Sequence, residues 1–90
     1  MSILGGFTQV FINKSQTGMN NLIGTRFAEF RKATGLSQKK FADRLQLLGL
    51  DVDKNAIQRI ECGKRFVTDI ELIYICKALG VDPNTLLEWK

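Results

Sequence analysis

Residues 35–65, GLSQKKFADRLQLLGLDVDKNAIQRIECGKR, hold the pattern that decides the fold. Ser37 and Asp53 each stand directly before a run with helical spacing, and their side-chain oxygens can accept hydrogen bonds from the unpaired amides of a first helical turn. Gly49 and Gly63 follow the two runs, at positions where a left-handed residue ends many helices. The stretch therefore predicts two short helices joined by a bend.

Each predicted helix has one apolar face. The residues that share these faces are Phe41, Ala42, Leu45 and Leu48 in the first helix, and Ile57 and Ile60 in the second. Core packing explains such faces in most helical hairpins, so the hairpin alone does not indicate a function.

The residues before the hairpin predict another helix, which begins at Asn20 or Asn21, reaches Ala33 or Thr34 and is ended by Gly35. Gly24 weakens its first turn. Its inward stripe is expected to comprise Leu22, Ile23, Phe27, Phe30 and Ala33 or Thr34, and its solvent face Arg26, Glu29 and Lys32. Arg31 lies beside the stripe, where a long side chain can reach the solvent.

Two more helices are predicted after the hairpin. Thr68 and Glu71 have the spacing of a capping box, and Asp82 before Pro83 is typical of a helix start. The buried stripe of the fourth helix is expected to contain Leu72, Ile75, Cys76 and Leu79, with Ile73 and Tyr74 beside it, and the short last helix carries Leu86, Leu87 and Trp89. Five helices and an all-α fold follow.

The order of motifs narrows the fold class. Gln38 follows the capping Ser37, small Ala42 permits a close helix crossing, and later motifs are Ile57-x-x-Ile60-Glu61-x-Gly63-Lys64-Arg65, Thr68-Asp69-x-Glu71-Leu72, Ala78-Leu79-Gly80-Val81 and Leu86-Leu87. From about Leu22 to Trp89 this series resembles the helix-turn-helix domains of phage repressors and Cro proteins, often called the XRE family. The resemblance implies a five-helix repressor-like domain at residues 21–90. It also implies a sequence-specific DNA-binding transcriptional regulator, expected to act as a repressor and as a homodimer on double-stranded DNA.

The same resemblance implies which residues meet DNA. The recognition helix would span about residues 53–62 and lie in the major groove. The matching DNA-binding positions are Gln38, Lys39, Lys54, Asn55, Gln58, Arg59, Lys64 and Arg65. Lys54, Asn55 and Arg59 are expected to read bases, with Gln58 taking over if the helix register shifts. The other positions, and Lys40, are expected to approach phosphates, while Arg31 and Glu61 would form a structural ion pair.

The chain departs from the family pattern between the hairpin helices. Residues 46–52 are about five more than a tight turn needs, so the first helix is expected to gain a turn through Leu48. A loop at residues 49–52 would then fold Leu47 or Leu50 inward. Cys62 replaces the usual polar residue before Gly63.

Composition agrees with a single DNA-binding domain. The chain has 90 residues and a formal charge of +4, and residues 26–65 carry ten Lys or Arg against five Asp or Glu. His is absent and Cys62 and Cys76 have no CxxC spacing, so neither a zinc site nor any cofactor is expected. No nucleophile with its base, carboxylate pair, membrane span or secretory signal is recognised, which favours a non-enzymatic cytoplasmic protein.

Two questions stay open at this point. Residues 1–20 form an N-terminal arm that is a disordered leader, a short strand used in dimerisation, or a DNA contact. The alternative to a DNA-binding regulator is a protein-interaction module, such as an antitoxin or adaptor on the same fold. Exposed Ile73, Tyr74 and Trp89 would favour that module. Dimerisation is expected through Leu86, Leu87 and Trp89.

Overall fold

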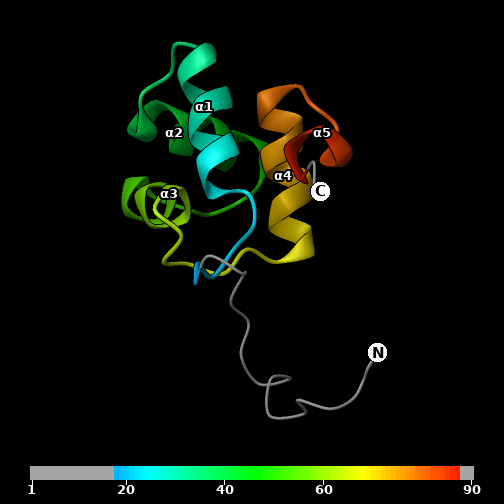
Figure 1. Ribbon diagram of the computed structural model, residues 1–90. Coiled ribbons are helices and arrows are strands. Elements are labelled where there is room, and N and C mark those ends of the chain that lie inside the picture. The colour runs from blue at the N-terminus through cyan, green and yellow to red at the C-terminus, as the bar shows by residue number, and fades with distance from the viewer. Residues whose placement is uncertain (1–17, 88–90) are drawn as a thin grey trace, which may run out of the picture.

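The computed structural model describes residues 18–87, which form five helices. They are α1 (Gly24–Ala33), α2 (Gln38–Leu48), α3 (Lys54–Glu61), α4 (Asp69–Leu79) and α5 (Pro83–Leu87). α2 packs against α3 and α4, while α1 packs against α3 and α5 (Figure 1). The expected five-helix, all-α architecture is confirmed. Most of the predicted N-terminal arm and Trp89 lie outside the described residues.

The predicted helix caps are formed. Ser37 Oγ accepts a hydrogen bond from the Lys40 amide at 3.1 Å, and Asp53 Oδ1 accepts one from the Ala56 amide at 2.8 Å. The capping box is complete, with distances of 3.1 Å from the Glu71 amide to Thr68 Oγ1 and 3.0 Å from the Thr68 amide to Glu71 Oε1. These local signals set the beginnings of α2, α3 and α4.

One core lies between the five helices. Phe27 of α1 and Phe41 of α2 are fully buried, with ring centroids 5.2 Å apart. The other buried apolar residues are Ile23, Ala42, Leu45, Val52, Ile57, Ile60, Ile75, Cys76, Ala78 and Leu86. Burial of this apolar surface stabilises the packing of α3 against α1 and α2.

The extra residues between α2 and α3 are accommodated as expected, by a longer α2 and a short loop. α2 continues through Leu48, and Gly49 ends it with a φ of +109°. Leu50 packs against the core and Leu47 is 89% exposed, so Leu50 is the residue that folds inward. Gln46 Nε2 donates to the Val52 carbonyl at 2.7 Å and thereby ties the loop to α2.

Some residues predicted to be in the core lie outside it. Leu48 is 43% exposed, because Leu50 and Val52 from the following loop fill the space beside α2. Leu22 is 50% exposed, because it precedes α1 and is not placed by helical periodicity. Ala33 and Thr34 are exposed at the end of α1.

The start of α1 differs from the prediction. The helix begins at Gly24, and Asn21 Oδ1 accepts a hydrogen bond from the Gly24 amide at 2.8 Å. Asn20 and Asn21 lie outside the helix, where their side chains bind carbonyls of the loop after α3. Arg26 is only half exposed, since it donates to the Thr85 carbonyl and lies over the Phe30 ring.

Candidate nucleic-acid interface

The solvent face of α3 is polar and continuous. Lys54, Asn55, Gln58 and Arg59 are exposed, whereas Ile57 and Ile60 of the same helix are buried. With 3.6 residues per turn, one arc of about 140° contains Lys54, Gln58, Cys62, Asn55 and Arg59. The structure therefore brings all four residues predicted for the recognition helix together on one face. The exposed Cys62 thiol lies on the same face.

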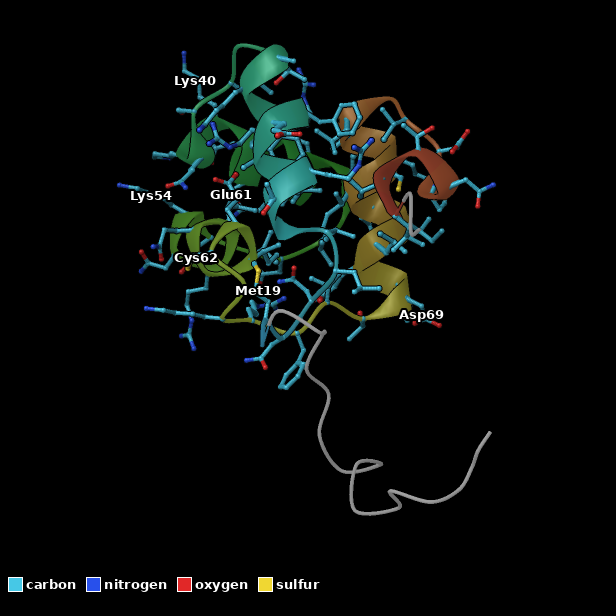
Figure 2. All side chains as sticks on the ribbon, in the orientation of Figure 1. Met19, Lys40, Lys54, Glu61, Cys62 and Asp69 are labelled. Carbon is cyan, nitrogen blue, oxygen red and sulfur yellow. The ribbon has the colours of Figure 1, made fainter. Side chains whose placement is uncertain are left out.

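Positive charge surrounds this face. Among residues 18–87, no carboxylate pairs with Lys40, Lys54, Arg59 or Lys64, and all four are exposed. Figure 2 shows Lys40 and Lys54 extending into solvent on the same side of the molecule. Lys39 pairs with Asp43 at 3.4 Å, but both side chains are mostly exposed, so the pair holds Lys39 weakly. Cations in this state are available to an anionic partner.

A groove of about 350 Å³ separates α2 from the start of α3. Its charged lining residues are Lys39, Asp43, Asp53 and Lys54. Two carboxylates beside two ammonium groups do not form an anion pocket, because the carboxylates would repel a phosphate. The groove is part of the hairpin surface and not a separate site.

The predicted ion pair joins α1 to the end of α3. Arg31 is 8% exposed, its Nη2 lies 3.1 Å from Glu61 Oε1, and its Nε donates to Glu61 Oε2. Arg31 Nη1 also donates to the Leu36 carbonyl at 2.7 Å. Gln38 Nε2 donates to Glu61 Oε1 at 3.0 Å, which ties the first residue of α2 to the same carboxylate. This network links α1 and the start of α2 to the end of α3.

Arg65 has a partner inside the protein. Its Nη1 and Nη2 each lie 3.0 Å from an oxygen of Glu71, at the start of α4. The hydrogen bond from Arg65 lowers the pKa of Glu71, and the bond to Glu71 raises the pKa of Arg65. The structure therefore separates the two neighbours after α3: Lys64 extends into solvent, and Arg65 clamps the loop to α4.

Sequence reasoning missed the role of the segment before α1. The Asn20 amide donates to the Gly63 carbonyl at 2.8 Å, and the Asn20 and Asn21 side chains bind carbonyls of residues 60, 64 and 65. Figure 2 shows Met19 next to Cys62 at the end of α3. Partners 39 to 44 residues apart leave no periodic signal, so the two Asn residues resemble a helix cap in the sequence.

The described residues contain no group of His, Cys, Asp or Glu that could hold a metal ion. Burial raises the pKa of the Cys76 thiol, which lies in the core. Within residues 18–87, no helix combines the length and hydrophobicity needed to span a membrane.

Comparison with known proteins agrees with this architecture. Residues 22–89 match a family model described as a helix-turn-helix domain. The crystal structure of the restriction-modification controller protein C.AhdI from Aeromonas hydrophila is similar, with 30% sequence identity and a TM-score of 0.63. The similarity covers 71% of this chain and 86% of that chain. No curated protein matches the chain.

Proposed function

This chain belongs to the helix-turn-helix domain family and is a DNA-binding regulator, and we propose that it recognises one specific duplex sequence through the exposed face of α3. The observation that carries the proposal is the continuous polar arc on α3, opposite the buried Ile57 and Ile60. An α-helix with its side chains is about 10 to 12 Å in diameter, which fits a major groove about 12 Å wide. α3 would enter that groove with its N-terminal end first.

The side chains on the arc have the chemistry of base readers. Asn55 can form two hydrogen bonds with adenine, while Lys54 and Arg59 can do the same with guanine. Gln58 lies between them on the arc and can also bind adenine. These residues have no carboxylate partner among those described, so they are free to reach base edges.

Other residues would bind phosphates and set the register of the protein on DNA. Lys39 and Lys40 lie at the start of α2, and Lys64 follows α3. Gln38 Nε2 already donates to Glu61, so Gln38 would bind phosphate through the second hydrogen of its amide. Contacts to phosphate add affinity without reading the sequence. We assign Arg65 a supporting role in this set, because its guanidinium binds Glu71 and would shape the loop that carries Lys64.

The proposal includes a homodimer on a two-fold site, with residues 21–90 as the DNA-binding unit. One module of this size makes too few contacts for strong discrimination, and a second copy doubles the footprint. Leu86 is fully buried in the core and cannot supply the dimer surface, whereas Phe66, Ile70 and Ile73 are exposed. We propose those three residues as the interface.

The structural neighbour is a restriction-modification controller, which supports a role in transcription control. We propose that this chain is a cytoplasmic repressor and has no catalytic activity. Its operator would overlap a promoter, so that the bound dimer excludes polymerase.

Selection from a pool of random duplexes with the purified protein tests the proposal. We expect a palindromic consensus whose half-sites lie about one helical turn apart. If the protein retains all duplexes equally, it does not recognise a specific base sequence. A protein that retains no DNA would instead be an interaction module on the same fold.

A further inference from the structure

The segment Met19–Asn21 grips the loop that follows α3. In Figure 1 the chain before α1 (blue) runs beside the loop between α3 and α4. The Asn20 amide donates to the Gly63 carbonyl at 2.8 Å, and Asn20 Nδ2 donates to the Lys64 carbonyl at 3.1 Å. These two bonds hold the backbone of the residues that present the Lys64 side chain.

Asn21 joins three parts of the backbone with one amide group. Its Nδ2 donates to the Ile60 carbonyl at 3.0 Å and to the Arg65 carbonyl at 2.9 Å, while its Oδ1 accepts from the Gly24 amide at 2.8 Å. An amide has two donors and one acceptor oxygen for this arrangement. Asp has no donor for the two carbonyls, so asparagine is the residue that fits.

Close packing leaves this junction little freedom. A Cβ on Gly24 would lie 2.6 Å from the Ile60 carbonyl oxygen, so the first turn of α1 touches the last turn of α3 directly. A Cβ on Gly63, where φ is +78°, would lie 2.9 Å from Met19 Cβ. Figure 2 shows Met19 at this contact, beside Cys62. The loop is thus held by hydrogen bonds on its carbonyls and by Met19 against Gly63.

We propose that Asn20 and Asn21 are positioning residues of the DNA interface, which lock residues 63–65 so that Lys64 meets a phosphate. The inference rests on the proposed DNA contact by Lys64. Neither asparagine side chain needs to touch DNA, because both act through the backbone that carries Lys64. Because the loop is already ordered before DNA binds, binding loses less conformational entropy than it would with a mobile loop, and the affinity is higher.

A purely structural role makes a different prediction from a positioning role. Loss of a structural contact lowers the free energy of unfolding but leaves the number of phosphate contacts unchanged. Loss of a positioning contact removes the phosphate contact of Lys64 and lowers the salt dependence of binding. Each phosphate contact adds about 0.9 to the slope of log affinity against log salt concentration. A fourfold rise in salt therefore weakens binding by about 3.5-fold less when one such contact has been lost.

The experiment compares wild type with Asn20→Ala, Asn21→Ala, Lys64→Ala and the double variant Asn20→Ala/Lys64→Ala. Asn84→Ala is the matched control, because Asn84 is exposed on α5, away from α3 (Figure 1). Dissociation constants are measured on the selected duplex and on a random duplex at 50 and 200 mM salt, and thermal unfolding shows which variants are folded.

We expect Asn20→Ala and Asn21→Ala to weaken binding to both duplexes about equally and to reduce the salt slope by about one unit, as for Lys64→Ala. The double variant should bind no worse than Lys64→Ala alone, since both changes remove one contact. If Asn21→Ala does not fold, Asn20→Ala alone tests the inference. This variant is expected to fold, because the backbone bond from residue 20 to the Gly63 carbonyl is kept.

The inference would be overturned if Lys64→Ala weakens binding but folded Asn20→Ala keeps the affinity and salt slope of wild type. Additive losses in the double variant would also overturn it. A wild-type protein that retains no duplex would instead defeat the proposed function itself. The two failures are therefore distinguishable.

Discussion

At the scale of single residues, Glu61 links three helices through one carboxylate. It accepts hydrogen bonds from Arg31 and Gln38, and Arg31 also binds the Leu36 carbonyl. Both ends of the ion pair are nearly buried, with side-chain exposures of 9% and 10%. A charge left without its partner in that place cannot be solvated well.

We therefore expect Glu61→Gln and Arg31→Met each to lower the free energy of unfolding by about 3 to 5 kcal/mol. Chemical denaturation measures this loss. The control is Asp43→Asn, which breaks the exposed pair with Lys39 and should cost about 1 kcal/mol or less. Losses below about 0.5 kcal/mol in both test variants would show that the pair does not stabilise the fold.

The pair of Arg65 and Glu71 makes stability depend on pH. The pKa of Glu71 is lowered in the folded state, so the folded protein binds its proton less readily than the unfolded chain. The stabilisation is complete above the ordinary pKa of 4.5 and decreases as the pH falls through the lowered pKa. Glu71→Gln should be less stable than wild type at neutral pH by about 1 to 2 kcal/mol. The difference should shrink below pH 4.5, and a difference that stays constant down to acid pH would contradict this account.

At the scale of elements, we expect α3 to read bases and the loop after α3 to bind phosphate through Lys64. Asn55→Ala or Arg59→Ala should cost about 1 to 3 kcal/mol on the selected duplex and little on random DNA. Lys64→Ala should weaken binding to both duplexes alike. Titration of the three variants on both duplexes at two salt concentrations measures the difference. Equal losses on both duplexes from Asn55→Ala and Arg59→Ala would mean that α3 does not read sequence.

The crossing of α1 and α3 explains the glycine that begins α1. Within a helix alanine is favoured over glycine by about 1 kcal/mol, but a Cβ on Gly24 would lie 2.6 Å from the Ile60 carbonyl oxygen. That oxygen belongs to the backbone and cannot move away cheaply. We expect Gly24→Ala to lower the free energy of unfolding by about 1 to 3 kcal/mol, as overpacking does. Thr25→Ala, on the exposed neighbour, should be nearly neutral, and a Gly24→Ala protein more stable than wild type would contradict the close approach.

At the scale of the whole molecule, the fold has basic residues at α3 and exposed apolar residues at α4. Ile70 is 66% exposed and Ile73 is three residues further along the same helix, so both side chains share a face. Exposed apolar residues gathered in one place often mark an interface. Two copies joined through α4 would carry two recognition helices.

We expect Ile70→Glu to raise the dimer dissociation constant at least tenfold, about 1.4 kcal/mol, and to weaken binding to a palindromic duplex more than to a half-site. Analytical ultracentrifugation at micromolar concentration measures the change. Leu47→Glu, at the tip of α2, is the control because Leu47 is still more exposed. A wild-type protein that is monomeric with and without DNA would exclude the proposed dimer.

The sequence alone determined the features whose causes lie within one helical turn. Ser37, Asp53 and Thr68 each bind an amide three residues ahead, so a cap can be recognised without knowledge of the rest of the chain. The buried positions of α3 follow from helical periodicity in the same way. The partnership of Arg31 with Glu61 was predicted from family resemblance and not from local pattern.

Only the tertiary structure decided the features that depend on distant partners. The delayed start of α1, the internal partner of Arg65 and the inward turn of Leu50 rather than Leu47 all depend on how separate elements meet. Asn20 and Asn21 show the reason most clearly. Asn21 Oδ1 does bind the nearby Gly24 amide, but the Nδ2 groups of both asparagines bind carbonyls 39 to 44 residues away, which the core brings within reach by packing α1 onto α3.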